Sequence, residues 1–336
     1  MEHNNDAVPL VETRNLRKFF KLKGGALLHA VDGVSLKIFP GQTMGVVGES
    51  GCGKSTLGRT ILKLLEPTSG QVFFDGKDIT NYSTGQMRPM RKSMQIIFQD
   101  PYSSLDPRKS IIEIIAEYMF IHRLYGNRRE TFNQAAKLMD HVGLARRYAN
   151  SYPHELDGGR RQRVGVARAL SLEPRFIVCD EPVSALDVSI QAQILNLLMD
   201  LQDELGLAYM FVTHDLSVVK HISDNIMVMY LGQCVEMAPS DELYKNPRHP
   251  YTKALLASIL KPDITTGDEE FRLIKGEVTS PINVAPSCRF AARCDFVMES
   301  CAKGDPALVE VGPGHFVACC LESRNAHSSV GAEQKT

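Results

Sequence analysis

The chain has 336 residues, 43% of them hydrophobic, which is enough for one large domain with a smaller appendage. With 38 Lys and Arg against 39 Asp and Glu, the formal net charge is -1, which excludes the global basic field of many nucleic-acid-binding proteins. No run approaches the roughly 20 apolar residues of a membrane-spanning helix, and residues 1–8 lack a signal peptide's apolar core, so we expect any role at a membrane to involve docking from the aqueous side.

Strand-like and helix-like segments alternate through the first three quarters of the chain. Short apolar runs at 44–47, 176–180, 209–214 and 226–230 predict buried strands, and residues 56–65 predict a helix after the first strand. Strands that are separated by helices favour a largely parallel sheet, so the predicted fold class is α/β.

The pattern changes twice along the chain. Between residues 100 and 170, helical patterns at 111–115 and 135–142 without a strong strand predict a helical subdomain inserted into the α/β core. Near residue 262 the composition becomes acidic and then rich in proline and cysteine. We therefore predict a first domain at 1–262 and a C-terminal extension at 263–336.

The turn after the first strand matches the complete phosphate-binding pattern G-x-x-x-x-G-K-[ST], formed by Gly48, Glu49, Ser50, Gly51, Cys52, Gly53, Lys54 and Ser55. In such a P-loop, backbone N–H groups and the N-terminal end of the next helix, here near Thr56, bind phosphate oxygens. Lys54 is expected to reach the β- and γ-phosphates and Ser55 to ligate Mg²⁺. A chance glycine-rich turn is the alternative, but the required strand and helix flank this motif.

Two acidic residues end the apolar run at 176–180. Asp180 is expected to hold Mg²⁺ through a water molecule, and Glu181 to act as the base that activates the attacking water. The alternative is that both acids cap a helix beginning near Pro182. The P-loop upstream favours the catalytic interpretation.

From residue 12 to about 260, the chain resembles the ABC ATPase family, which implies a P-loop NTPase core with an inserted helical subdomain. Gln99 resembles the Q-loop glutamine, which contacts Mg²⁺ and the attacking water and reports to membrane subunits. His214 resembles the switch histidine that contacts the γ-phosphate. Residues 184–187 resemble the D-loop, whose Asp187 belongs to the nucleotide site.

The family also places an aromatic residue against adenine. Phe20 is at this position, and Phe19 is the second candidate. The resemblance completes a candidate ATP site whose catalytic residues are Lys54, Gln99, Glu181 and His214.

In this family the nucleotide lies between two ATPase subunits, and the second subunit contributes a segment usually written L-S-G-G-Q. Here the segment departs at two positions and consists of Leu156, Asp157, Gly158, Gly159 and Arg160. Aspartate caps a helix as well as serine does, so the helix is expected to form. As an anion at ~4 Å from phosphate it would be repelled by roughly 4 kcal/mol at an effective dielectric of about 20. Arg160 could offset that repulsion or pair with Asp157.

This departure leads to the hypothesis of a heterodimer with a second ABC ATPase subunit. The competent site would join this P-loop to the partner's L-S-G-G-Q, while the partner's P-loop would face Asp157 and hydrolyse slowly. The alternative is a tolerated variation with two working sites.

Four cysteines near the end of the chain have the spacing C-x5-C-x6-C-x17-C, namely Cys288, Cys294, Cys301 and Cys319, with Cys320 next to the last. Zinc sites commonly contain C-x2-C pairs, which are missing here, whereas a four-thiolate iron–sulfur cluster requires only four sulfurs brought together. The spacing alone does not choose between them. With residues 105–108, 182–189 and 246–251, this tail resembles dipeptide and oligopeptide permease ATPases, specifically their second ATPase subunit. The resemblance implies a [4Fe-4S] cluster on the four cysteines, with Cys320 as a substitute and Zn²⁺ or free thiols as alternatives.

The same resemblance implies an ATP- and Mg²⁺-dependent ATPase of an ABC importer for di- or oligopeptides, or for related solutes such as nickel complexes. It would lie at the cytoplasmic face of a bacterial membrane, with two membrane permease subunits, a second ATPase subunit and, indirectly, an extracytoplasmic solute-binding protein as partners, and no nucleic acid. A soluble ABC ATPase acting on DNA or ribosomes is the alternative, but the chain has one cassette and no long coiled-coil insertion. A subunit that binds ATP without hydrolysing it is disfavoured by the intact Glu181 and His214.

Overall fold

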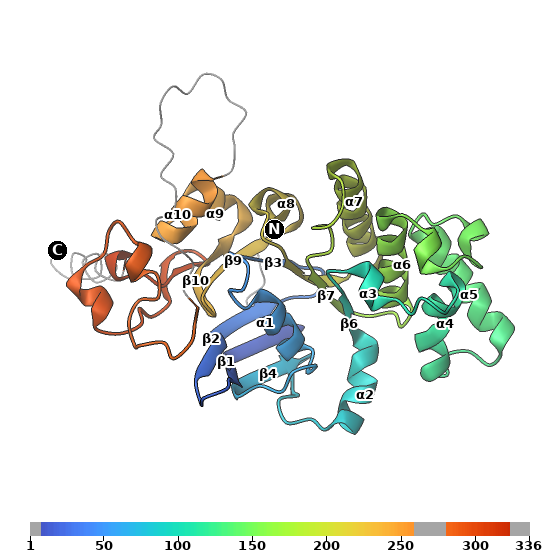
Figure 1. The fold of residues 1–336 in the computed structure, drawn as a ribbon, viewed down its shortest axis with the longest axis horizontal. Helices are drawn as coiled ribbons and strands as arrows, with labels where there is room; N and C mark the ends of the chain where they lie inside the picture. Colours follow the sequence, from blue (N-terminus) through green and yellow to red (C-terminus); the bar gives the residue numbers. More distant parts are fainter. Residues whose placement is uncertain (1–7, 259–279, 323–336) are drawn as a thin grey trace, which may run out of the picture. The chain divides into compact units, whose positions relative to one another are not determined.

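The computed structural model describes residues 8–258 and 280–322, which fall into two compact units (Figure 1). The described residues of the first unit are 8–12, 37–43 and 73–212. Those of the second unit are 13–36, 44–72, 213–258 and 280–322. The predicted domain boundary at 262 and 263 lies outside the described residues.

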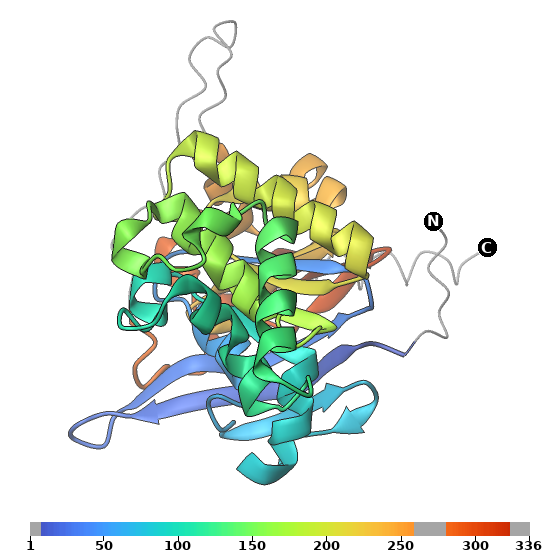
Figure 2. The ribbon, with the colours of Figure 1, turned by 90° about the vertical axis from the view of Figure 1, so that its right-hand side faces the viewer.

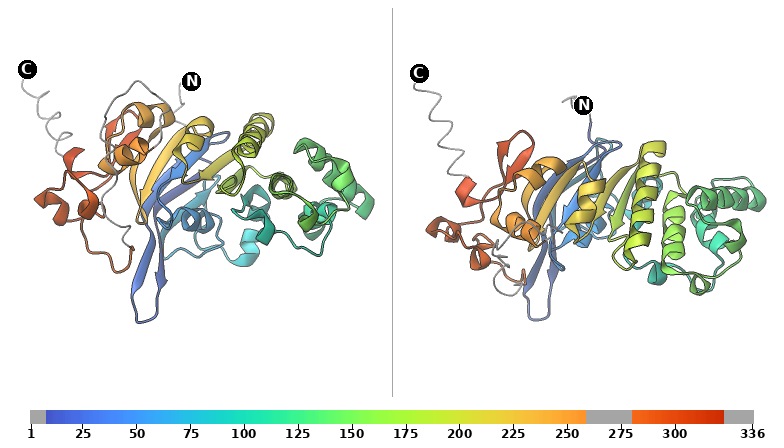
Figure 3. Two further views of the ribbon diagram at one scale, coloured as in Figure 1. Left: turned by 45° about the horizontal axis from the view of Figure 1, so that its top comes forward. Right: turned by 90° about the horizontal axis from the view of Figure 1, so that it is seen from above.

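The second unit contains the strand that precedes the P-loop. Its strands run in the order β11-β12-β10-β9-β3. Their bounds are Thr43–Val47 for β3, Asn225–Tyr230 for β9, Gln233–Pro239 for β10, Val309–Gly312 for β11 and His315–Val317 for β12. β3 and β9 are parallel and almost wholly buried, as expected for strands covered on both faces. β12 pairs antiparallel with β10, so the C-terminal segment extends the sheet that carries the P-loop (Figure 3).

Three further strands form an antiparallel sheet, and most of their residues belong to the second unit. In the order β2-β1-β4, they are Leu27–Ile38, Val11–Lys21 and Ser69–Phe74. Buried and exposed residues alternate along much of β2, which indicates one covered and one accessible face. At the far end of β4, Phe73 and Phe74 pair with the short strand β5 (Lys77–Asp78) in the first unit.

Four α-helices and two short 3-10 segments complete the described part of the second unit. They are α1 (Lys54–Ile61), α8 (Leu216–Ile222), α9 (Ser240–Lys245), α10 (Pro250–Ala257), η3 (Ala291–Arg293) and η4 (Glu299–Ala302). The predicted helix at 56–65 is present but begins two residues earlier and ends at Ile61, because Lys63 has a left-handed φ of 54°.

The first unit contains three parallel strands in the order β8-β7-β6, namely Ala208–Val212, Phe176–Asp180 and Met94–Ile97. Every residue of β7 and β8 is buried, which agrees with the predicted apolar runs. The strand predicted at 209–214 ends earlier, at Val212, so His214 lies beyond it. The α-helices α2 (Thr84–Ser93) and α7 (Val188–Leu205) belong to the same unit.

A group of helices lies between β6 and β7 in the chain (Figure 2, green). It consists of α3 (Pro101–Ser104), α4 (Ile111–Ile121), α5 (Arg128–His141), η1 (Arg146–Tyr148), η2 (Pro153–Glu155) and α6 (Gly158–Leu170). Both predicted helices are present. α4 begins at Ile111 as predicted, after a capping box at Ser110, and continues to Ile121; α5 begins earlier than predicted, at Arg128, because the Asn127 side chain caps it there. α4 packs against α5 and α6 through its buried isoleucines. Within residues 8–258 and 280–322, no helix is long and apolar enough to cross a membrane.

Candidate functional site

The P-loop in the second unit has a backbone shape that its glycines permit. Gly53, the N-cap of α1, has a φ of 105°, and a Cβ atom there would lie 1.9 Å from the carbonyl oxygen of Ala30. Only glycine fits so close an approach at a positive φ. The turn therefore delivers the chain directly into α1, whose first residues are Lys54, Ser55 and Thr56.

Lys54 is buried inside the loop that it belongs to. Its Nζ donates to the carbonyl oxygens of Gly48 at 2.7 Å and Glu49 at 3.0 Å. The backbone N–H of Cys52 also donates to the Glu49 carbonyl, at 3.3 Å. The ammonium group is thus positioned at the centre of the loop, beside the N-terminus of α1, where anions bind favourably.

Gln99 and Glu181 meet in the first unit. The Nε2 atom of Gln99 donates to Oε2 of Glu181 at 2.8 Å. Glu181 directly follows buried Asp180 at the end of β7, and its φ of 47° is rare for a residue with a side chain. Its backbone N–H donates to the Val212 carbonyl at 2.9 Å, which fixes this conformation. The structure therefore brings together two of the four residues predicted to be catalytic.

The alternative in which the two acids cap a helix is wrong. Residues 181–187 form a turn, and α7 begins at Val188 with Asp187 at its N-cap position. The side-chain amide of Gln191 donates to the carbonyl oxygens of Val183 and Leu186, both at 3.0 Å. These bonds satisfy carbonyls in the turn, so the chain does not continue into a helix at Pro182.

The segment 156–160 begins α6. Asp157 is the N-cap, and its Oδ1 accepts from the backbone N–H of Arg160 at 2.8 Å, so the expected capping is confirmed. The guanidinium group of Arg160 also pairs with Asp157 and lies 5.0 Å from the ring centroid of Tyr148. Both side chains of the pair are about half exposed, so its contribution to stability is small.

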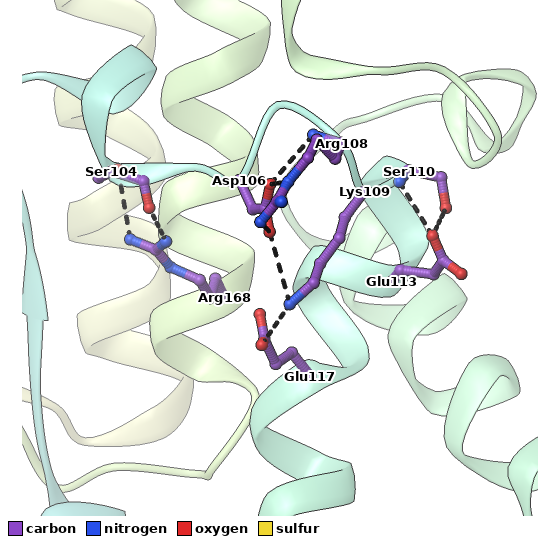
Figure 4. Close-up of polar contacts among 8 residues, drawn as sticks. All are labelled: Ser104, Asp106, Arg108, Lys109, Ser110, Glu113, Glu117 and Arg168. Atoms are coloured by element: carbon purple, nitrogen blue, oxygen red, sulfur yellow. Dashed lines mark hydrogen bonds and ion pairs between the residues drawn. The ribbon is translucent and has the colours of Figure 1, made fainter.

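A buried arginine of α6 holds the segment that contains Gln99. Arg168 donates to the carbonyl and hydroxyl oxygens of Ser104 (Figure 4), and its guanidinium lies 5.9 Å from the ring centroid of Phe98. Phe98 precedes Gln99 and Ser104 ends α3, so Arg168 contacts both ends of residues 98–104. Burial lowers the pKa of Arg168.

The chain after Ser104 is fixed by further ion pairs and caps. Lys109 pairs with Glu117 and with Asp106, and Glu113 accepts from Ser110, the N-cap of α4 (Figure 4). Arg168 therefore lies next to an ordered turn that leads into the helical group. We did not single out Arg168 from the sequence, although it is the only charged residue in the apolar stretch 164–172.

Five cysteines of the second unit line one small pocket, which we call the cysteine pocket: Cys288, Cys294, Cys301, Cys319 and Cys320. His249 and Phe290 also line it, and its volume is about 10 Å³, which is room for a single water molecule. None of the five is in a disulfide. Burial raises the pKa of Cys288 to about 11, so this thiol is protonated at neutral pH.

The four cysteines predicted as ligands all line this pocket, but the pocket is too small to hold an iron–sulfur cluster. Among the residues that the structure describes, no group of three or more His, Cys, Asp or Glu side chains is arranged to hold a metal ion. The structure thus brings the four predicted cysteines together, whereas a bound iron–sulfur cluster or zinc ion stays a prediction.

Comparisons with known proteins agree with both parts of the sequence. The family model described as "ABC transporter" matches residues 31–184, and the one described as "Oligopeptide/dipeptide transporter, C-terminal region" matches residues 235–301. The putative oligopeptide transport ATP-binding protein YkfD of Bacillus subtilis is 50% identical, over 96% of this chain and 98% of its own. The oligopeptide transport ATP-binding protein OppF of Salmonella typhimurium is 47% identical, over 92% of this chain and 95% of its own.

The chain is an ABC transporter ATPase of the oligopeptide permease family. Solved structures agree with this assignment. A dimeric ATP-binding cassette in a post-hydrolysis state, bound to ADP and phosphate, has a TM-score of 0.63 and 29% identity, covering 68% of this chain and 98% of its own. CbiO1 of Clostridium perfringens, part of an ABC transporter complex, has a TM-score of 0.63 and 28% identity, covering 71% and 91%.

Two more predicted residues of this ABC ATPase lie in the second unit. His214 is exposed, directly after Thr213, whose backbone N–H donates to the carbonyl of Val46 in β3 at 3.2 Å. On β1, the Phe19 ring packs against His29 in a tilted arrangement with ring centroids 4.1 Å apart, while the Phe20 ring has the Lys18 ammonium 5.0 Å from its centroid. Because Phe19 already packs on a ring of the sheet, Phe20 stays the better candidate to stack on adenine.

Proposed function

We propose that this ABC ATPase hydrolyses ATP to drive the import of peptides through partner membrane subunits. The observation that carries the hydrolytic part is the hydrogen bond between Gln99 and Glu181, since it joins the Q-loop glutamine to a carboxylate at the end of a buried strand. The peptide part is supported by relatives that are named as oligopeptide transport ATP-binding proteins.

In this proposal the side chains have separate tasks. Lys54 neutralises charge on the β- and γ-phosphates, while Ser55, Asp180 and Gln99 hold Mg²⁺. Glu181 accepts the proton of the attacking water, and His214 contacts the γ-phosphate. Phe20 stacks on adenine, and residues 156–160 with Asp187 complete the nucleotide site of a partner subunit.

Two substitutions separate binding from hydrolysis. Glu181→Gln keeps the hydrogen-bonding shape and removes the base, so turnover should fall by about 100-fold or more while ATP binding is retained. Lys54→Ala should abolish binding of MgATP itself. The exposed Glu204→Gln on α7 is the matched control and should change neither quantity. Full turnover in the Glu181→Gln variant would exclude this site as the hydrolytic one.

Partners and cargo require a separate experiment. We expect the chain to co-purify from the cytoplasmic face of the membrane with two permease subunits and a second ATPase subunit, in a complex that an extracytoplasmic solute-binding protein loads. Uptake of a labelled oligopeptide by reconstituted complex should stop in the Glu181→Gln variant. Recovery with ribosomes or DNA, or uptake of nickel complexes alone, would contradict the peptide assignment.

The Asp157 departure motivates an asymmetric heterodimer. Arg160 pairs with Asp157 and contacts the ring of Tyr148, so it offsets part of the aspartate's charge, but the carboxylate still cannot donate a hydrogen bond to phosphate as a serine would. Turnover of the complex should collapse with Glu181→Gln and barely change when the partner's equivalent acid is replaced. Equal losses from the two changes would show two working sites.

We further propose that the cysteine pocket binds a [4Fe-4S] cluster through Cys288, Cys294, Cys301 and Cys319. Support comes from the five cysteines that line one pocket without forming a disulfide, although this pocket must widen to admit a cluster. Such a cluster would supply electron-transfer chemistry or a structural cross-link. Protein purified without oxygen should contain about four irons per chain and absorb in the visible range. Stoichiometric zinc, or no metal, would contradict the cluster.

A further inference from the structure

A residue far along the chain holds the carboxylate of the P-loop glutamate. Arg293 donates from Nη1 to Oε2 of Glu49 at 2.8 Å and from Nη2 to Oε1 at 3.0 Å. The Arg293 side chain is 6% exposed and that of Glu49 is 20% exposed, so water screens this pair weakly. The two parallel hydrogen bonds also fix the orientation of the carboxylate, which a single contact would not do.

Two buried tyrosines also contact this ion pair between Arg293 and Glu49. The backbone N–H of Glu49 donates to the hydroxyl of Tyr251 at 3.0 Å, and Nη1 of Arg293 donates to the hydroxyl of Tyr230 at 3.4 Å. The two tyrosine rings pack with their centroids 4.7 Å apart. Glu49 is therefore held through its backbone and its side chain by residues outside the P-loop.

The position of Glu49 matters for Lys54. The carbonyl oxygen of Glu49 is one of the two acceptors for the Lys54 ammonium group, at 3.0 Å. A displacement of Glu49 moves this carbonyl, and with it the loop amides that are arranged around the phosphate position. Arg293 thus acts on the P-loop without itself belonging to it.

The same arginine lies next in the chain to a residue of the cysteine pocket. It is the last residue of η3 and directly precedes Cys294. Its backbone N–H donates to the carbonyl of Phe290 at 2.9 Å. The Phe290 ring lines the pocket and packs on Tyr230 and Tyr251 at centroid distances of 5.3 and 5.4 Å. Phe290, Arg293 and Glu49 therefore form a continuous chain of contacts from the pocket to the P-loop.

A second arginine makes a parallel connection. Arg289 follows Cys288, and it donates to the carbonyl of Leu231 and to the carboxylate of Asp32. The next residue, Gly232, accepts from the backbone N–H of Asp32 and donates to the carbonyl of Cys52 in the P-loop, both at 2.8 Å. Arg293 therefore contacts the P-loop directly at Glu49, and Arg289 is connected to it at Cys52 through residues 231–232.

We propose that Arg293 is a positioning residue for ATP binding, through which the state of the cysteine pocket alters the nucleotide affinity of the P-loop. The proposal rests on the role of Lys54 in phosphate binding, and it needs no metal in the pocket. Because binding couplings are reciprocal, ATP at the P-loop must equally alter the pocket.

The first test is a double-mutant cycle on the full chain, with the affinity for MgATP and kcat measured separately. Arg293→Gln should weaken binding on the order of tenfold and change kcat much less. Arg293→Lys should restore part of the affinity, since it keeps the charge and loses the fork. Combined with Glu49→Gln, Arg293→Gln should add little further loss. Arg146→Gln, which breaks an exposed pair with Asp140, should leave the affinity unchanged.

The outcomes separate this proposal from the proposed function. A wild-type chain that fails to bind MgATP overturns the proposed function. Normal binding by Arg293→Gln, or losses that add fully with Glu49→Gln, overturns the positioning role alone. Thermal unfolding of each variant shows whether it is folded before its affinity is interpreted.

The second test begins with the unsubstituted protein, so its main outcome does not depend on a variant that folds. Maleimide labelling is followed peptide by peptide, which separates Cys294 from Cys52 of the P-loop. Saturating MgATP should change the labelling rate of Cys294 at least about threefold, and Arg293→Lys should reduce this change. An unchanged rate at Cys294 would overturn the coupling.

Discussion

The P-loop and the Q-loop segment are both held by a buried arginine that belongs to neither motif, but the two arginines have different partners. Arg293 binds a carboxylate, that of Glu49, in the second unit. Arg168 binds the neutral carbonyl and hydroxyl oxygens of Ser104 in the first unit. The first contact is an ion pair, so it depends on the charge of both partners. The second depends on hydrogen-bond geometry and on packing against Phe98.

The largest expected effect tests whether the backbone shape of the P-loop is as strict as the contact at Gly53 indicates. Gly53→Ala would place a Cβ 1.9 Å from the Ala30 carbonyl, so we expect loss of ATP binding and about 4 kcal/mol of stability. Gly51→Ala is the matched control, because its φ of 79° is also positive but no atom lies within 4 Å of its Cβ. It should cost about 1 kcal/mol from backbone strain alone. Chemical denaturation and nucleotide binding measure both, and equal losses would refute the steric explanation.

Arg168 should behave in the opposite way to Arg293. Arg168→Met keeps the packing on Phe98 and removes the donors to Ser104, so we expect a loss of about 2 kcal/mol and a drop of roughly tenfold in kcat with ATP affinity retained. Arg168→Lys should not restore kcat, because one ammonium cannot reproduce the fork geometry. Steady-state kinetics and direct nucleotide binding separate the two quantities.

The matched control for Arg168 is Arg108→Gln, which breaks an exposed pair with Asp106 on the same turn (Figure 4). It should leave kcat and the unfolding midpoint unchanged. A loss of ATP affinity in Arg168→Met, with kcat unchanged, would erase the proposed contrast between the two arginines.

Acid should affect the second unit through a carboxylate that joins the C-terminal segment to the sheet. Glu236 of β10 is fully buried and accepts from the backbone N–H groups of Arg248 and His249 at 2.7 and 2.9 Å, and it also bonds to the side chains of Thr252 and of His315 in β12, whose Nε2 lies at 2.7 Å. Burial alone would raise the pKa of Glu236, but these hydrogen bonds outweigh it and lower the pKa.

Since the pKa of Glu236 is lower in the folded chain than in the unfolded one, its stabilisation is present above the unfolded value of about 4.3 and is lost as the pH falls through the folded value. Glu236→Gln should cost about 3 kcal/mol at pH 7 and flatten the decline of stability in acid. The exposed Glu310→Gln on β11 is the control. Unfolding free energies measured from about pH 3 to about pH 7, a range that includes the unfolded pKa, compare the two variants. An unchanged acid limb in Glu236→Gln would exclude this residue as its source.

The residues that sequence reasoning found and missed differ in how their interactions are encoded. Lys54, Glu181 and Asp157 lie in local patterns, where a turn, a strand end or a helix start fixes the side chain within a few residues. The buried strands could also be predicted from the sequence, because a short apolar run indicates a strand that is covered on both faces of a sheet.

Arg293 and Arg168 were missed because their partners are 244 and 64 positions away, and no local period links them. Arg168 had a weak signal, since it interrupts an apolar stretch, and a buried charge needs a partner. Arg293 lies between Cys288 and Cys294, and this segment was interpreted only as a source of metal ligands. Long-range pairing of side chains depends on the tertiary fold, which periodicity does not specify.

The smallest expected effect concerns the start of α6, where the charged pair is exposed in contrast to both buried arginines. Asp157→Ser keeps an N-cap acceptor and removes the pair with Arg160, so the unfolding free energy should change by less than about 0.5 kcal/mol. The effect on hydrolysis should be larger than the effect on folding, because this residue would face the partner's ATP. In the complex, Asp157→Ser should raise the turnover that survives in Glu181→Gln, since the site on the partner's P-loop then regains a neutral hydroxyl donor. If that residual turnover does not rise, the aspartate does not silence the second site, and the exposed pair with Arg160 has neither a structural nor a catalytic consequence.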